Sequence, residues 1–327
     1  SGQLVLFAAL CATSAAAREY DELGRLEKEA VDSVLRTQGL QLEEQPEGKV
    51  LGAIHVANLD VFSAREPYLT WLNRLHVVTR NDVVAREILL HPGEPWSQTR
   101  IDESLRNLRN PFLSNVVVLL PVKSASAGKV DLLVVTRDVW SLRLNSGFEV
   151  QDGLVTVATF SLSENNVLGR RKRFAAVFYM DQSAISVGPT YEDGNLAGSR
   201  LVATSALRAI FSRDEQAFEG TRSQTTIAYP LWSLARRWGA AFSVTHFDAP
   251  VRRFRGTTLR TFDVPETPEV EAIPWSYHYR ALSTEAYVVH STGTTTKQLF
   301  YLGHELDLTR PSVAEPMSLD APTRTAF

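Results

Sequence analysis

The pattern of hydrophobic and polar positions divides the chain into two parts of different texture. Up to Asp138, apolar residues recur with a period near 3.6 in some stretches and form short β-branched runs in others. The predicted elements are, in order, a polar helix within 18–45, a strand over 50–62, a short helix or turn over 66–73 carrying Trp71, helices over 80–90 and 97–109, and strands over 115–122 and 130–136. This order predicts a small α+β unit with a βααββ core.

The helices of this part are predicted from their apolar stripes and end signals. Thr79 is the expected N-cap of the first core helix, because its hydroxyl can accept a hydrogen bond from a free amide of the first turn. His91-Pro92-Gly93 is expected to end that helix, and Asn110-Pro111 to end the second. The expected buried positions are Leu23, Leu26, Ala30, Val34 and Leu35 in the N-terminal helix, Val83, Val84, Ile88 and Leu89 in the next, and Ile101, Leu105 and Leu108 in the last.

From Val139 onward the period changes to two, and turn signals recur every few residues. In 237–245, for example, Trp238, Ala240, Phe242 and Val244 alternate with small or polar residues. Strands that are polar on one side and apolar with aromatic residues on the other are typical of a transmembrane β-barrel. A soluble β-sandwich also alternates in this way. Tyrosine and tryptophan near the predicted strand ends favour the barrel.

The N-terminus has the pattern of a secretory signal peptide. Leu4–Ala12 is an apolar core, and Ala15-Ala16-Ala17 is a small-residue cleavage site before Arg18. Lipidation at Cys11 is disfavoured, because Leu10 stands where a small residue is usual. The expected division is a partial signal peptide over 1–17, a helical segment over 18–47, an α+β domain over 48–138 and barrel strands over 139–327.

Composition excludes some classes of function. The formal net charge is −3, so the chain lacks the basic excess of a nucleic-acid-binding protein. No pattern of catalytic residues stands out, since His304-Glu305 lacks the second histidine of a zinc-protease helix and no G-x-S-x-G motif is present. We therefore expect no enzyme activity, no cofactor and no metal site.

Several motifs resemble one known family in order and spacing. They are Leu75-His76-x-x-Thr79-Arg80, Arg86-Glu87-Ile88-Leu89-Leu90, Pro92-Gly93-Glu94, Asp102-Glu103-Ser104-x-Arg106-Asn107-Leu108-Arg109 and Pro111-Phe112-Leu113. This stretch resembles a POTRA domain, the polypeptide-transport-associated module of the BamA/TamA outer-membrane assembly family. The segments 163–170 and 191–198 resemble the first periplasmic turns of that family's barrel.

The chain also departs from that family. The resemblance implies a barrel of roughly sixteen strands, whereas 139–327 has room for about nine strands of ordinary length. Only one POTRA-like module is visible, and Arg253-Phe254-Arg255-Gly256 only superficially resembles the family's inward-folding loop motif. We therefore expect a piece of a longer protein, cut inside its signal peptide and inside its barrel.

The candidate site residues belong to the backbone edges and turns that the resemblance singles out. The strand edge expected to receive client segments comprises Asn115, Val116, Val117, Val118, Leu119, Leu120 and Val122. The expected barrel seam is the first barrel strand, near 139–150, with Val139, Leu142, Leu144 and Phe148. The expected periplasmic turn contains Asn166, Leu168, Gly169 and Arg170.

Two groups of cations are candidates for lipid contact. The run 170–173 is either a solvated turn or a site for anionic head groups. The segment 246–273 is expected to be a long external loop that carries Arg252, Arg253, Arg255 and Arg260, which could meet lipopolysaccharide phosphates.

The resemblance implies a protein of the cell outer membrane with its POTRA domain in the periplasm. The expected function is insertion or translocation of other proteins at that membrane. A two-partner secretion transporter and a passive or lipid-handling barrel with a docking POTRA domain remain alternatives. The expected partners are unfolded outer-membrane or secreted clients, periplasmic chaperones or accessory lipoproteins, and outer-membrane lipid.

Overall fold

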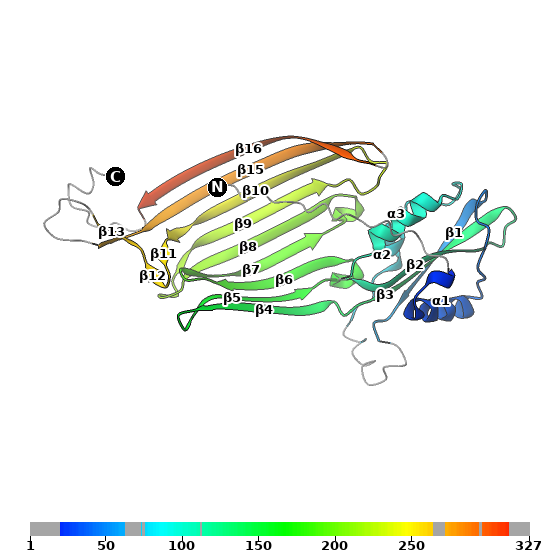
Figure 1. Ribbon diagram of the computed structural model, residues 1–327, viewed down its shortest axis with the longest axis horizontal. Coiled ribbons are helices and arrows are strands. Elements are labelled where there is room, and N and C mark those ends of the chain that lie inside the picture. Colours follow the sequence, from blue (N-terminus) through cyan, green and yellow to red (C-terminus); the bar gives the residue numbers. More distant parts are fainter. Residues whose placement is uncertain are drawn as a thin grey trace. The chain divides into compact units, whose positions relative to one another are not determined.

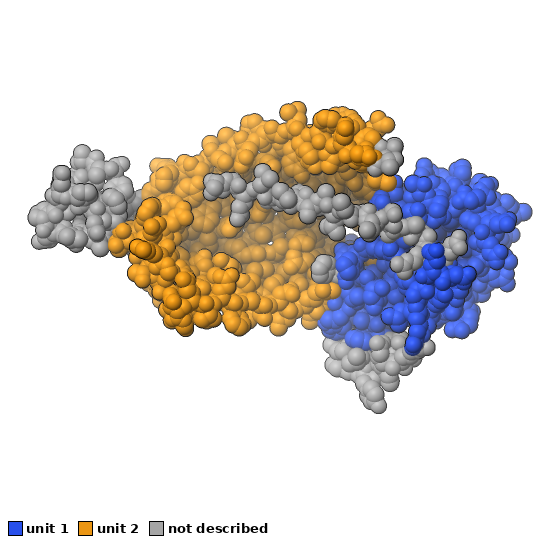
Figure 2. All heavy atoms as spheres, viewed as in Figure 1, with its two compact units in different colours: residues 1–140, 168–170 blue, residues 141–167, 171–327 orange. Residues whose placement is uncertain are grey.

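The computed structural model describes residues 20–62, 73, 76–111, 113–263, 272–293 and 296–313, which form two compact units (Figure 2). The first unit runs to Trp140 and also includes Leu168–Arg170, and the second contains the rest. The predicted signal peptide, Cys11, Trp71, Leu75 and Phe112 lie outside the described residues.

The first unit is a three-stranded mixed sheet with helices on both faces. Its elements are the 3-10 turn η1 (Tyr20–Glu22), α1 (Arg25–Gln38), β1 (Val50–Leu59), α2 (Asn81–Ala85), α3 (Gln98–Leu108), β2 (Ser114–Lys123) and β3 (Lys129–Asp138). The strand order is β1-β3-β2, with β1 parallel and β2 antiparallel to β3. The predicted order of two helices between a first strand and a terminal hairpin is therefore confirmed.

Alternation along β2 and β3 supplies apolar residues to both faces of this sheet. One face packs against the stretch 84–108, through a core that contains Val84, Ile101, Leu105, Val117 and Leu119. The other face packs against α1, through a core that contains Ala30, Val31, Val34, Val118 and Leu120. The N-terminal helix thus shares a core with the strands that follow it.

Three predictions about the helices are wrong. Leu26 is 59% exposed, and Val31 occupies the buried face of α1 in its place. Thr79 does not cap α2, because the N-cap residue is Arg80. The amide and hydroxyl of Thr79 instead donate to the buried carboxylate of Asp138, at 2.7 and 3.0 Å. That helix also stops at Ala85, well before the predicted end at 91–93.

The second unit is built on one antiparallel sheet of nine strands in sequential order, and it is hollowed in the view of Figure 2. The strands are β4 (Leu142–Gln151), β5 (Leu154–Glu164), β6 (Lys172–Met180), β7 (Ala184–Asp193), β8 (Val202–Ser212), β9 (Phe218–Tyr229), β10 (Trp238–Arg252), β15 (Ser276–Thr292) and β16 (Gln298–Val313). They lie side by side in one curved layer (Figure 1). The predicted number of strands is confirmed.

The segment predicted as one long loop over 246–273 begins later and is partly ordered as strands. Residues up to Arg252 belong to β10, which pairs with β15 as far as Ser276. Two small ribbons follow, formed by β11 (Phe254–Arg255) with β12 (Thr258–Leu259) and by β13 (Thr261–Asp263) with β14 (Ala272–Pro274).

The register gives the nine-stranded sheet one polar and one apolar face. A row that crosses all nine strands consists of Arg143, Ser163, Ala175, Thr190, Ala206, Gln224, Thr245, Ser283 and Asp307. Alternate residues form the apolar face, which includes Leu144, Leu162, Phe174, Phe242, Leu302 and Leu308. The predicted alternation is confirmed across the sheet except along β9, where Thr221, Ser223 and Thr225 lie on the apolar face.

None of the described helices is both long enough and apolar enough to cross a membrane. Within the same described ranges, no three histidine, cysteine or acidic side chains are grouped so that they could hold a metal ion.

Candidate functional site: an open strand edge and a two-faced sheet

The strand β2 lies at one edge of the three-stranded sheet, as the sequence predicts for this segment. Its side chains are nonetheless buried, because alternate residues enter the cores on opposite faces of the sheet. Of the predicted edge residues, only Asn115 is exposed, and it lies where the register with β3 shifts between Ser114 and Val116. The accessible chemistry of this edge therefore belongs to the backbone.

A short segment of the same chain already pairs with one end of this edge. Leu42 forms an antiparallel bridge with Val122. The amide of Glu43 donates to Pro121 O at 3.0 Å, and the amide of Lys123 donates to Gln41 O at 2.8 Å. The backbone groups of Pro121 and Lys123 thus point away from β3.

Strand geometry extends this orientation along β2. Successive residues of a strand direct their backbone groups to opposite sides, so alternate residues share one direction. Val117 and Leu119 therefore present N–H and C=O groups to the open side, whereas Val118 and Leu120 present theirs to β3. Pro121 fits this assignment, because a proline in an edge strand needs an outward position where no ladder donor is lost.

The segment that pairs with β2 leaves the edge after Glu43, where Lys49 Nζ bonds the Glu43 carboxylate at 2.5 Å. This hydrogen bond is the largest of the effects that hold the pKa of Glu43 below its usual range.

The rest of the edge is open. No strand within the described ranges covers β2 between Asn115 and Leu120. Pro121 and residues 41–43 were not predicted as part of the site. The proline inside a β-branched run was the only sequence signal for them.

The predicted seam strand corresponds to β4, which has a neighbour on only one side in the nine-stranded sheet. Leu142, Leu144 and Phe148 lie on the apolar face of β4 and are 45%, 72% and 73% exposed. Val139 lies outside this strand, which begins at Leu142, so its inclusion in the seam is wrong. Its amide donates to Leu113 O at 3.0 Å, and this bond holds it at the end of the first unit's sheet.

The predicted turn follows β5 and is closed by the side chain of Asn166. The Asn166 amide donates to Glu164 Oε1 at 2.7 Å, and Asn166 Oδ1 accepts from the Arg171 amide at 2.9 Å. Leu168 and Gly169 have positive φ angles of 55° and 69°. Gly169 cannot be replaced without movement, because an added Cβ would lie 2.5 Å from Val78 O.

The turn after β7 repeats this design. The Asn195 amide donates to Asp193 Oδ1 at 2.9 Å, and positive φ angles recur at Ala197 and Gly198. Two members of the basic run 170–173 have acidic partners on β7. Lys172 lies 2.8 Å from Asp193 Oδ2, and Arg173 lies 2.5 Å from Glu192 Oε1.

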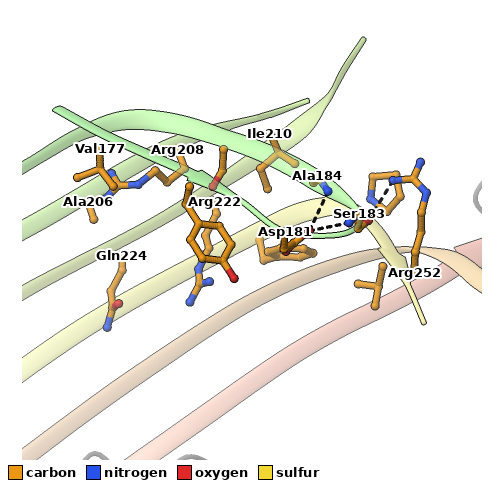
Figure 3. Close-up of a pocket in the computed structure, with 15 residues that line it drawn as sticks. Val177, Asp181, Ser183, Ala184, Ala206, Arg208, Ile210, Arg222, Gln224 and Arg252 are labelled. Atoms are coloured by element: carbon orange, nitrogen blue, oxygen red, sulfur yellow. Dashed lines mark hydrogen bonds between the residues drawn. The ribbon is translucent and has the colours of Figure 1, made fainter. Parts of the chain in front are cut away.

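The polar face of the nine-stranded sheet contains a cavity of about 550 Å³ (Figure 3). Arg208 and Arg222 lie opposite each other on β8 and β9 at its wall, next to Gln224. The Arg208 guanidinium donates to Pro189 O at 2.7 Å and to Thr190 Oγ1 at 2.8 Å, where the β7–β8 ladder is interrupted. A face with such charges suits water, whereas the opposite face does not.

No family model matches the sequence, and no curated protein matches it. Solved structures similar to the chain include the following two. BamA from Haemophilus ducreyi lacking POTRA domains 1-3 aligns with 11% identity and a TM-score of 0.47, over 82% of this chain and 52% of that one. CdiB from Acinetobacter baumannii aligns with 9% identity and a TM-score of 0.32, over 81% of this chain and 46% of that one. The chain spans about half the length of each of these structures.

Proposed function

We propose that this chain is part of an outer-membrane β-barrel protein with a periplasmic POTRA domain, which inserts client proteins into the outer membrane or translocates them across it. The βααββ order and the β1-β3-β2 sheet support the POTRA assignment. The two-faced sheet of nine strands supports the barrel assignment. The proposed mechanism contains no covalent step.

The exposed apolar face is the observation that carries the proposal. Leu144, Phe148 and Leu302 are between 72% and 81% exposed, and all three lie on this face. Further large exposed residues on the same face are Phe160, Leu162, Phe174, Leu207, Phe218, Ile227, Phe242, Val288, Phe300, Leu306 and Leu308. A monomeric soluble protein rarely exposes an apolar surface of this extent, whereas lipid covers such a surface in a membrane barrel.

The open part of β2 supports a role in handling extended polypeptides. An added strand bonds through its backbone, so clients of different sequence can use the same edge. The pairing of residues 41–43 with 121–123 is an example of such an addition within the chain itself. In this proposal, a client segment pairs with the free donors and acceptors of Val117 and Leu119.

The barrel seam is a second place where client strands could pair. In β4 one edge lacks a partner among the strands of the described sheet. Unpaired backbone groups are costly at membrane depth, so an edge that opens there favours pairing with a client strand. Export of one dedicated partner and a lipid-handling role remain alternatives. These two alternatives differ from the proposed function in the molecule that the protein handles: one dedicated partner protein in the first, and lipid in the second.

Proline substitution at Val117 tests the edge. Val117→Pro removes an outward donor, and Val117→Ala is the matched control, because both variants lose the buried valine side chain. We expect Val117→Pro to slow client insertion into proteoliposomes while Val117→Ala retains it. Thermal melting of both variants ensures that only folded protein is compared. Equal insertion by the two would exclude strand addition at Val117 and favour the seam.

Localisation has a separate test. The proposal requires export, and N-terminal sequencing of envelope-purified protein should then begin at Arg18. A cytosolic, uncleaved product would contradict the assignment to the outer membrane.

A further inference from the structure

Three neighbouring turns are tied together at one end of the nine-stranded sheet. They connect β7 to β8, β9 to β10 and β15 to β16. The Ser291 amide donates to Arg237 O at 2.7 Å, and Lys297 Nζ donates to Leu234 O at 2.9 Å. The Arg200 guanidinium lies 4.8 Å from the ring centroid of Trp232. These contacts define one surface, which we call the turn rim: Arg200, Trp232, Leu234, Arg236, Arg237 and Lys297.

The turn rim carries cations and no acidic side chain. The sequence stretches 194–213, 220–247 and 286–304, which contain these three turns, have no aspartate or glutamate. The acidic residues at the nearby end of β7, Glu192 and Asp193, pair with Arg173 and Lys172. The turns at the opposite end of the same sheet contain Asp152, Asp181 and Asp214. The three turns of the rim thus carry only positive charge, whereas the opposite end of the sheet carries both signs, since Arg213 and Arg253 also lie there. The turn rim therefore attracts anions.

Apolar and aromatic side chains are interleaved with these cations. Two guanidinium groups lie over the ring of Trp232: that of Arg236 is 4.6 Å and that of Arg200 is 4.8 Å from its centroid. Leu234 and Trp238 are 45% and 59% exposed. Tryptophan beside arginine is typical of the membrane interface, where the ring sits at head-group depth and the cation reaches phosphate.

The turn rim also lies at one boundary of the apolar face. On β10, that face begins at Trp238 and ends at Asp248. Charged residues also stand at this level on the next two strands, since Asp248 pairs with Arg280 of β15, and Arg280 pairs with Arg310 of β16. Ten residues of a tilted strand span about 25 Å along the barrel axis, which matches the apolar band of outer-membrane barrels. Head groups would therefore begin just beyond Trp238.

We propose that the turn rim binds the phosphate groups of anionic phospholipids. This inference rests on the proposed function, because it requires the apolar face to sit in a bilayer. A basic side chain near an anionic membrane strengthens binding about five-fold, and two such side chains about 25-fold. The rim would thus select anionic lipid on the turn side of the barrel.

The test uses full-length protein and the variant Arg236→Gln/Arg237→Gln. Vesicles of phosphatidylcholine and vesicles of equimolar phosphatidylcholine and phosphatidylglycerol are titrated, and bound protein is measured by flotation. The wild type should prefer the anionic vesicles, and the variant should lose about 25-fold of that preference while binding phosphatidylcholine unchanged. The matched control is Arg36→Gln/Arg109→Gln, which removes two exposed cations of the first unit and should keep the preference.

The outcomes separate this inference from the proposed function. Wild-type protein that binds neither kind of vesicle would contradict the membrane barrel itself. Membrane binding with the same anionic preference in wild type, variant and control would overturn the role of the turn rim alone. Equal losses in variant and control would also overturn it, since net charge would then explain the effect. Displacement of the anionic preference by inorganic phosphate would identify a phosphate site that does not require lipid.

Discussion

The carboxylate of Asp131 accepts a hydrogen bond from the backbone amide of Ala53 at 2.9 Å. The pairing of β1 with β3 shifts register between Leu51 and Ile54, so this amide lies in an irregular part of the ladder. His55 Nε2 lies 3.1 Å from the other oxygen of the same carboxylate. One side chain of β3 thus closes a gap in the parallel pairing of the first unit.

The stability of the first unit should depend on the ionisation of Asp131. Burial alone would raise the pKa of Asp131, but hydrogen bonds from Ala53, His55 and Ser124 outweigh it and lower the pKa. A lowered pKa contributes stability above the unfolded value of about 3.9, and that stability is lost as pH falls through the folded value. Asp131→Asn should therefore flatten the decline of the urea midpoint below about pH 4.

The exposed Asp60 provides a control for this experiment. Asp60→Asn should leave the acid dependence of the urea midpoint as it is in the wild type. An unchanged acid dependence in Asp131→Asn would show that this carboxylate does not stabilise the pairing of β1 with β3.

Gly52 should resist replacement because of the same carboxylate. A Cβ at this position would lie 2.3 Å from Asp131 Oδ1 and 3.2 Å from Ser124 Oγ. Gly52→Ala should lower the free energy of unfolding by roughly 1–3 kcal/mol, through displacement of the carboxylate from the Ala53 amide. In Asp131→Ala the same change should cost less, since the two effects share one contact. Additive costs in the double variant would contradict this coupling.

The sequence predicts those features of the first unit that depend on local periodicity. The helix α3 spans Gln98–Leu108, and its predicted buried residues Ile101, Leu105 and Leu108 are buried. The role of Thr79 was wrong, because its partner Asp138 lies 59 residues away and no local pattern encodes that bond. Thr79 lies one residue before the N-cap, and its hydroxyl donates to Asp138.

In the second unit, too, the sequence predicts the features that depend on local periodicity and misses those that depend on contacts between distant residues. Its two faces follow from the alternation of polar and apolar residues along most strands, which the sequence shows directly. The end of β10 did not follow, since His246, Asp248 and Pro250 look polar or strand-breaking when read alone. In the structure Asp248 contacts His278 and Arg280 of β15, and this cross-strand cluster continues the pairing. Such contacts join residues about 30 positions apart and leave no periodic signal.

The first unit should unfold cooperatively as an isolated fragment of residues 20–140. A fragment of 48–138, which the sequence alone defines as a domain, would lack α1 and expose Val118 and Leu120. It should therefore melt at a lower temperature than 20–140. Equal melting of the two fragments would show that α1 contributes nothing to this core.

Within that fragment, Leu105 and Leu26 provide a matched pair of leucines. Leu105 is 2% exposed, so Leu105→Ala should cost about 2–5 kcal/mol of unfolding free energy. Leu26 is 59% exposed, so Leu26→Ala should change it by less than about 0.5 kcal/mol. Chemical denaturation of both variants measures the two costs, and similar values would refute the burial assignment of α1 or α3.

The direction of backbone groups in β2 has its own test in the stability of two proline variants. Val117 and Val118 are 5% and 4% exposed, so proline removes a similar buried side chain at each position. The Val118 amide points toward β3, and its loss breaks a ladder bond and places the proline ring against the neighbouring strand. Val118→Pro should therefore unfold at a lower urea concentration than Val117→Pro. Its free energy of unfolding should be lower by roughly 1–3 kcal/mol. The alanine variants at both positions correct for the lost side chains.

If Val117→Pro is as destabilised as Val118→Pro, the outward amide of Val117 already has a partner, and the edge is not free to receive a client strand.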